Sequence, residues 1–216
     1  GYTGGRDFNS RYVYHNIPVS PNGTSLLYGL SRSQSIPTKE FAPYDIRSKS
    51  NDASISLHQD LFTDKGPLVE AWVGFAAKDK TTTMTTGTYS RDRLRIIDIG
   101  ASLTFKGMAS STTFSPVISQ GLTAFGASSQ NNPLASRGAS SSFTKLNLDI
   151  AHKRFLTRNM QANLRLRTQL ASTKLTPQTE FSSGGIDSVR GYPGGDYMAD
   201  NAAVLNSELV FPAPFI

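Results

Sequence analysis

The sequence has no cysteine among its 216 residues, which excludes disulfide frameworks and zinc–thiolate sites. It also lacks the run of ~18 apolar residues that a transmembrane helix needs, because the longest candidate, Leu68 to Ala77, is short and contains Glu70. Apolar residues make up 38% of the chain, against roughly 45–50% in soluble domains. Disorder is disfavoured by the 12 Phe and 8 Tyr. The composition suits one all-β domain, either soluble or in a membrane.

The dominant periodicity is two residues, which predicts β-strands. In segment 160–170, Met160, Ala162, Leu164, Leu166 and Leu170 alternate with Gln161, Asn163, Arg165, Arg167 and Gln169. Two arginines and three amides on one strand face need water or a dense polar network. Similar alternation occurs at 11–17, 24–34, 52–61, 68–78, 94–106, 112–125, 143–154 and 202–211. The pattern predicts roughly nine strands, each long enough for the ~9–11 residues that cross a bilayer.

The connectors between these segments differ in length. Long polar connectors are expected at Ile36–Ser50, Asp79–Asp92 and Ala127–Ser141, and short ones at Pro18–Gly23, Thr63–Pro67 and Leu156–Asn159. Long loops on one side and tight turns on the other are typical of outer-membrane barrels. The runs Thr81–Thr83 and Ser140–Ser142 are expected at solvated loop tips. A soluble antiparallel sandwich also alternates, so it stays open as an alternative.

Catalysis, metal binding and nucleic-acid binding have little support. A triad drawn from residues 183–185 with His152 and either Asp149 or Asp187 lacks the Gly-x-Ser-x-Gly elbow. The three histidines have no metal-ligand spacing, and the glycines at 184–195 lack the Gly-Lys-Ser/Thr ending of a phosphate loop. The net charge is +6, and the lysines and arginines are scattered along the chain without forming a basic run or stripe. We therefore expect a protein that is not an enzyme, with no metal, cofactor or nucleic-acid partner.

The segment Phe181–Asp200 is the most unusual part of the chain, because it holds five of the 18 glycines. Such density indicates either flexibility or a tightly folded loop, and its tyrosines favour a loop that packs on something. Its motif residues are Gly184, Gly185, Ser188, Val189, Arg190, Gly191 and Tyr192, followed by acids up to Asp200 and a strand with Glu208. This order resembles the sixth surface loop of two-partner secretion transporters. That family includes the haemolysin activators and the filamentous-haemagglutinin transporter, in the superfamily of the barrel-assembly insertases.

The resemblance implies an antiparallel transmembrane β-barrel in the outer membrane of a Gram-negative bacterium. Residues 1–216 would be a partial barrel of roughly nine strands, with residues 173–200 as a loop in the lumen. About sixteen strands close the barrel of this family, and its periplasmic domains and Phe-x-Asp-x-Gly strand are also missing, so we expect a fragment. The implied function is secretion of a large partner exoprotein from periplasm to cell surface. The expected partners are this exoprotein and outer-membrane lipid, with a monomeric barrel.

The resemblance also implies a role for Arg190, whose counterpart in the family pairs with acids on the inner wall. An uncompensated buried charge costs several kcal/mol, and the planar guanidinium suits a carboxylate. In 202–211 the odd positions are apolar and suit lipid, which places Asn206 and Glu208 in the lumen. We therefore expect Arg190 near Glu208. The alternative is an exposed loop arginine without a partner.

Four basic residues are predicted to line the lumen, namely Lys145, Lys153, Arg165 and Arg167. Such a wall would guide an extended polypeptide in a transporter or select anions in a porin. Simple charge balance with Asp149 is an equally good explanation. Two other functions remain open: a barrel-assembly insertase, and a soluble β-domain that binds carbohydrate or protein.

Overall fold

The computed structural model describes residues 1–5, 7–37, 39–61, 66–129, 131–185 and 191–211. They form a ten-stranded antiparallel sheet in the order β1-β2-β3-β4-β5-β6-β7-β8-β9-β12 and a separate pair, β10-β11. The large sheet consists of β1 (Tyr2–Gly4), β2 (Phe8–Ser20), β3 (Thr24–Ser35), β4 (Arg47–Leu61), β5 (Leu68–Met84), β6 (Gly87–Lys106), β7 (Ser110–Gly121), β8 (Thr144–Thr157), β9 (Met160–Ala171) and β12 (Ala202–Val210). The pair consists of β10 (Phe181–Ser183) and β11 (Tyr197–Ala199), and two short 3-10 helices are η1 (Lys39–Tyr44) and η2 (Ser136–Gly138).

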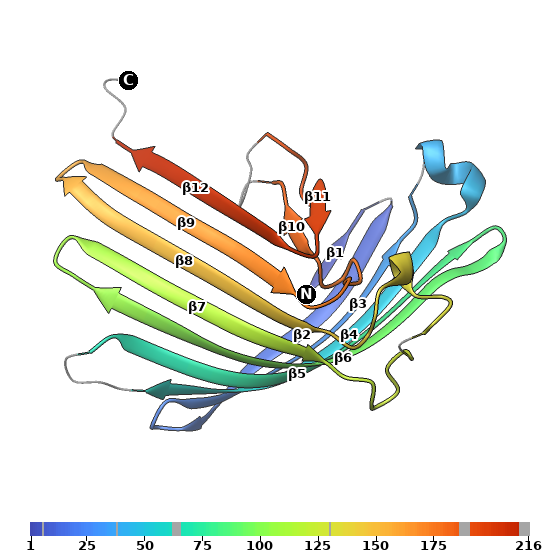
Figure 1. Ribbon diagram of the computed structural model, residues 1–216, viewed down its shortest axis with the longest axis horizontal. Coiled ribbons are helices and arrows are strands. Elements are labelled where there is room, and N and C mark those ends of the chain that lie inside the picture. The colour runs from blue at the N-terminus through green and yellow to red at the C-terminus, as the bar shows by residue number, and fades with distance from the viewer. Residues whose placement is uncertain (6, 38, 62–65, 130, 186–190, 212–216) are drawn as a thin grey trace.

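The sheet curves into a trough in which β10 and β11 lie (Figure 1). In the described part of the chain β1 and β12 are not paired with each other, so the sheet is an open section of a barrel. The prediction of an all-β antiparallel barrel, incomplete in this chain, is confirmed. No helix among the described residues is long and apolar enough to cross a membrane.

Each long strand presents alternate residues to the two faces of the trough. On β9, Gln169 is 2% exposed under the connector 172–201, whereas its neighbour Leu170 is 60% exposed on the opposite face. We call the face with Gln169 the concave face and the other the outer face. Large aliphatic side chains crowd the outer face, among them Ile99 at 60% and Leu205 at 68% exposure.

The outer aliphatic side chains form a belt close in height to the apolar band of outer-membrane barrels. On β4 the belt runs from Ala53 to Leu61, about 26 Å along the strand at ~3.3 Å per residue. A strand tilt of ~40° reduces this to about 20 Å along the membrane normal, close to the ~25 Å apolar band of outer-membrane barrels. The soluble sandwich is not favoured by an outer face of this kind.

The two ends of the sheet differ. At the turn end the connections are short, as at 21–23, 107–109 and 158–159. At the loop end lie the connectors 36–46, 122–143 and 172–201. These three long connectors therefore lie at one end of the sheet, as expected, with short turns at the other.

One expected loop is wrong. Asp79–Asp92 is not a connector, because β5 continues to Met84 and β6 begins at Gly87. The threonine run Thr81–Thr83 belongs to β5, where the hydroxyl of Thr82 lies 2.9 Å from that of Ser48 on β4. Threonine is β-branched and favours strands, so this polar run extends a hairpin and does not form a loop tip.

Ser140–Ser142 also differs from expectation. The hydroxyl of Ser141 is buried and donates to the carbonyl of Ser128 at 2.6 Å. The run therefore belongs to a packed connector and not to a solvated tip.

Candidate translocation lumen

The four predicted basic residues all lie on the concave face. Register places Arg167 opposite Asp149 and Lys153 opposite Asn163, while Lys145 and Arg165 share their parity on β8 and β9. They do not act as one free cationic surface, since each has a different environment. Lys153 lies toward the turn end, with its Nζ 5.2 Å from the ring centre of Phe155.

Arg165 is bound to Asp149 on the neighbouring strand. Its Nη2 lies 2.6 Å from Oδ2, and its Nε lies 3.0 and 3.1 Å from the two carboxylate oxygens. The side chains are 49% and 30% exposed, so the pair is solvated and contributes little to stability. Charge balance with Asp149, the alternative raised from sequence, therefore describes Arg165.

Lys145 and Arg167 hold the connector 172–201 onto the wall. The Nζ of Lys145 donates to the backbone carbonyl of Thr179 at 3.1 Å. The guanidinium of Arg167 lies over the ring of Phe181 in β10, 5.5 Å from its centre. Phe181 is buried, so this cation–π contact is shielded from water, where such contacts are strongest.

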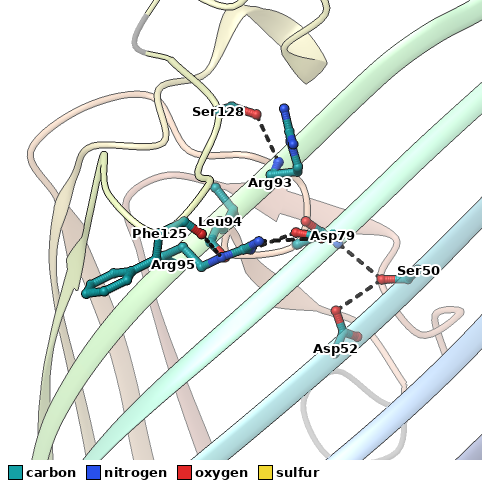
Figure 2. A network of polar contacts seen from close by, with 9 residues as sticks. Ser50, Asp52, Asp79, Arg93, Leu94, Arg95, Phe125 and Ser128 are labelled. Carbon is teal, nitrogen blue, oxygen red and sulfur yellow. Dashed lines mark hydrogen bonds and ion pairs between the residues drawn. The ribbon is translucent and has the colours of Figure 1, made fainter.

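The connector 122–143 covers the backbone edge that β6 exposes where it extends beyond β7. The amides of Leu122 and Ser128 donate to the carbonyls of Arg95 and Arg93 at 2.7 and 2.8 Å. The amide of Arg91 donates to Leu134 at 2.7 Å, and that of Arg93 to the hydroxyl of Ser128 at 3.0 Å (Figure 2). An uncovered strand edge would leave these groups unpaired. The connector therefore continues the sheet beyond the end of β7.

Asp92 fixes the same connector from the concave face. It is 3% exposed, and its carboxylate accepts from the amide of Ser136 at 2.9 Å and from the Ser136 hydroxyl. Ser136 begins η2. A buried carboxylate with two donors is satisfied, so Asp92 anchors η2 to the wall.

An apolar cluster fills the loop end of the trough. Leu94 and Ile96 of β6 meet Phe143 and Leu175 from the two connectors, and these four side chains are at most 4% exposed. Leu175 is completely buried. The cluster lies on the concave face, whose other side chains are mostly polar, so the connectors cover part of this face with a small dry core.

The two connectors are joined to each other by an ion pair. Nη1 of Arg137 lies 2.8 and 2.9 Å from the two carboxylate oxygens of Glu180. The carboxylate side chain is 3% exposed and the arginine side chain 54%. Glu180 thus depends on Arg137 for its compensation.

The connector 172–201 joins β9 to β12, and both of its ends are held together beside the end of β9. The side-chain amide of Gln169 donates to the carbonyl of Asp200 at 3.0 Å, and the Asp200 carboxylate accepts from the amide of Leu175 at 2.7 Å. Asn201 accepts from the amide of Ala171 at 2.7 Å. These bonds close the base of the connector.

Farther along, the connector reaches the opposite wall. The side-chain Nε2 of Gln178 donates to the hydroxyl of Ser50 on β4 at 3.3 Å. In the sheet order β4 is five strands from β9. Ser50 itself donates to Asp52 at 3.2 Å (Figure 2). The connector therefore bridges two walls of the trough.

The glycines of the motif have different structural roles. A side chain at Gly184 would place its Cβ 2.1 Å from the carbonyl oxygen of Pro193, and the φ of Gly184 is 113°. Gly191 has a φ of 90°, and none of the described residues has an atom within 4 Å of a Cβ built there. Of these two glycines, Gly184 is therefore the one at which the backbone approaches closely. The amide of Gly185, at φ 86°, donates to the carbonyl of Tyr192 at 2.9 Å.

The remaining motif residues divide between described and undescribed parts. Tyr192 is half-exposed, and its ring centre lies 6.0 Å from that of Tyr197 in β11. Ser188, Val189 and Arg190 lie outside the described residues, and with them the predicted contact between Arg190 and Glu208. Glu208 is on the concave face of β12, opposite Asn163.

Sequence reasoning missed Asp92, Leu94, Ile96, Gln178 and Glu180. A signal for two of them was present, since Leu94 and Ile96 occupy even positions on β6, where Asp98, Gly100 and Ser102 follow. Apolar residues on the polar face of a strand indicate a local cover. The partners Asp92 and Glu180 carry no such pattern, because each is fixed by a residue more than 40 positions away.

Comparison with known proteins agrees with this geometry. The model of the family "Haemolysin secretion/activation protein ShlB/FhaC/HecB" matches residues 3–216. No curated protein matches the chain.

Three solved structures share the fold. CdiB from Escherichia coli has a TM-score of 0.80 at 20% identity, over 97% of this chain and 39% of its own. CdiB from Acinetobacter baumannii has a TM-score of 0.71 at 16% identity, over 96% and 37%. BamA from Haemophilus ducreyi, in a structure lacking POTRA domains 1-3, has a TM-score of 0.65 at 15% identity, over 97% and 46%. The chain thus spans less than half of each.

The family is one of transporter barrels and not of enzymes. The family model matches nearly the whole chain. The open antiparallel sheet fits one section of the wall of such a barrel. The chain belongs to the haemolysin secretion/activation family, a family of two-partner secretion transporters, and it is a section of a β-barrel of the Gram-negative outer membrane.

Proposed function

We propose that the chain forms part of a monomeric pore wall through which a partner exoprotein passes from the periplasm to the cell surface. In this proposal residues 1–216 belong to one barrel domain embedded in outer-membrane lipid, and residues 173–200 occupy the lumen before transport. Family membership supports the transport function. The observation that carries the lumen role is the bridge from β9 to β4 through Gln178 and Ser50.

A connector in this position must leave the lumen, or move within it, before a polypeptide can pass. Its attachments suit reversible binding. They include the Arg137–Glu180 pair with its exposed arginine, the bond from Lys145 to Thr179, and the contact of Gln178 with Ser50. None is covalent, and each can be exchanged for water or for exoprotein.

Crosslinking of the connector to the wall tests this proposal. Ser50→Cys and Gln178→Cys introduce two thiols into a chain without cysteine, and a short bis-maleimide reagent joins them. We expect exoprotein secretion to fall to background in the crosslinked double variant. The two single-cysteine variants, treated in the same way, are the controls and should secrete normally. Normal secretion by the crosslinked double variant would contradict the proposal.

We further propose that Arg190 is pinned by Glu208 in the lumen. Glu208 supports this by its place on the concave face, and a carboxylate there suits a guanidinium in a shielded site. Arg190→Ala should abolish or strongly reduce secretion while the protein level in the membrane is unchanged, and Glu208→Gln should act in the same direction. Arg158→Ala, in the turn at the opposite end, is the matched control. Normal secretion by Arg190→Ala would contradict the proposal that Arg190 anchors the loop.

A further inference from the structure

The outer face of the sheet carries a cluster of cations just beyond the aliphatic belt, at the loop end. One row across the sheet runs Arg11, Arg32, Asn51, Asp79 and Arg93 on β2 to β6. The next row toward the loops runs Asn9, Gln34, Lys49, Thr81 and Arg91. We call Arg11, Arg32, Lys49, Arg91 and Arg93 the basic band.

The adjoining row toward the turn end is largely apolar. It runs Val13, Leu30, Ala53, Ala77 and Arg95, and Val13 and Leu30 are 62% and 60% exposed. The boundary of the lipid belt therefore falls between the basic band and this row. A cation at such a boundary is at the depth of lipid headgroups.

The only carboxylate in these rows is already bound. Asp79 accepts from Nη1 of Arg95 at 2.7 Å, and Nε of Arg95 donates to the carbonyl of Phe125 at 3.0 Å (Figure 2). No member of the basic band forms an ion pair with a described residue. Arg11 and Arg32 are directly opposite each other in the ladder, an arrangement in which like charges destabilise a sheet.

The surface between these cations is hollowed. A groove of about 350 Å³ is lined by Tyr2, Asn9, Arg11, Arg32, Gln34 and Lys49. A larger groove next to it shares Arg11 and Arg32 and continues over Val13, Leu30 and Ala53. The smaller groove is lined by cations and the larger one continues over aliphatic side chains. A ligand that fills both grooves therefore needs a polyanionic head and an aliphatic tail.

We propose that the basic band binds a phosphorylated, acylated glycolipid of the outer leaflet, a molecule of the lipid A class. The loop end faces the cell surface in barrels with this distribution of loops and turns. A phosphate monoester carries about −1.5 to −2 charges, so five cations match more than one phosphate. Guanidinium groups suit phosphate oxygens, and the acyl chains lie on Val13, Leu30 and Ala53. Binding also removes the repulsion between Arg11 and Arg32.

The test uses the whole transporter purified in detergent, with lipid A as ligand and native mass spectrometry or a binding isotherm as readout. Each Lys or Arg near an anionic lipid surface contributes roughly fivefold in affinity, so the double variant Arg11→Gln/Arg32→Gln should weaken binding about 30-fold. The matched control is Arg154→Gln/Arg158→Gln, which removes two exposed arginines at the turn end and should bind as the native protein does. Lys49→Gln alone should weaken binding about fivefold and keeps the test usable should the double variant not fold.

Phosphatidylglycerol and inorganic phosphate distinguish the sources of the anion. Native protein should prefer lipid A to phosphatidylglycerol, and inorganic phosphate at millimolar concentration should not displace it. Unchanged binding by Arg11→Gln/Arg32→Gln, or equal loss in the turn-end control, would overturn the site. Equal binding of phosphatidylglycerol, or displacement by phosphate alone, would overturn the glycolipid as its ligand.

Discussion

The loop end and the turn end of the same strands differ in what surrounds them. Among the described residues, all six buried hydrophobic side chains lie at the loop end, on β6 or on the connectors 122–143 and 172–201. At the turn end, Leu61, Phe155 and Leu156 are about half exposed. Strand pairing extends to both ends, with one register irregularity at the turn end of β8 and β9. Strand pairing therefore shapes the trough, whereas burial within the chain comes only from the connectors.

The two ends are therefore stabilised by different interactions. At the turn end the outer aliphatic groups are covered by lipid, and every strand amide must be paired because the bilayer offers no water. At the loop end Leu175, Phe143 and their neighbours are removed from water by protein, which stabilises by about 25 cal/mol per Å² of apolar surface. Substitutions at the loop end should consequently release the connectors while the barrel strands stay paired.

The largest effect is expected for Leu175→Ala. Leu175 is completely buried among Leu94, Ile96 and Phe143, and truncation of such a leucine costs about 3 kcal/mol. The docked connector 172–201 should become sensitive to protease and exchange its amide hydrogens faster. Leu205→Ala on the outer face, where the leucine is 68% exposed, is the control and should leave the connector protected. Equal protection in the two variants would mean that the apolar cluster does not hold the connector.

A pair of glycine substitutions comes next. Gly184→Ala adds a Cβ 2.1 Å from the carbonyl of Pro193 at a φ of 113°, so clash and strain act together and we expect a loss of about 2 kcal/mol or more. Gly191→Ala adds a Cβ that no atom of the described residues approaches within 4 Å, at a φ of 90°, so only the strain of about 1 kcal/mol remains. Hydrogen exchange of the amides in β10 and β11 measures both. A larger effect for Gly191→Ala would contradict the packing described for this hairpin.

Arg137→Ala tests the link between the two connectors. It leaves the buried carboxylate of Glu180 without its partner, which we expect to cost about 1–2 kcal/mol after allowance for the solvent exposure of the arginine. The double variant Arg137→Ala/Glu180→Gln removes the uncompensated charge and should recover part of the loss. Protease sensitivity of connector 172–201 in Arg137→Ala, Glu180→Gln and the double variant forms a double-mutant cycle. Additive effects would show that the pair is not coupled.

The smallest effect is expected for Arg165→Gln. Its pair with Asp149 is solvated, with side chains 49% and 30% exposed, so the free energy of unfolding should change by less than about 1 kcal/mol. The midpoint of denaturant unfolding in detergent measures this change. If Arg165→Gln lowered the free energy of unfolding as much as Leu175→Ala does, the solvated part of the concave face would contribute as much stability as the buried cluster at the loop end.

The two-residue alternation in the sequence predicted most of the strands of the large sheet and the face to which their side chains point. The alternation in 160–170 matches β9, with Gln169 on the concave face and Leu170 outside. The parity assigned to 202–211 also holds in β12, where Leu205 and Leu209 are exposed and Glu208 is half-buried. The prediction failed at 79–92, because the polarity of threonine was given more weight than its β-branched shape.

The candidate site was only partly predictable. The glycine-rich segment was identified from composition and from its resemblance to a family loop, and four of its five glycines do have a positive φ. The contacts of Asp92 with Ser136 and of Gln178 with Ser50 join residues that are 44 and 128 positions apart. A periodicity covers one strand and its neighbours, so it contains no information about such partners.

The sequence by itself determined the strands and which side chains of each strand share a face, because the side-chain period of a strand is two and this chain keeps it over most of its length. It also determined the position of the glycine-rich segment. Only the tertiary structure decided that two connectors fold into the trough and bury Leu94 and Ile96 on an otherwise polar face. It likewise aligned Arg11, Arg32 and Lys49 at the edge of the lipid belt. The physical reason is that register, curvature and loop docking bring together residues from different strands, and these depend on contacts distant in the sequence.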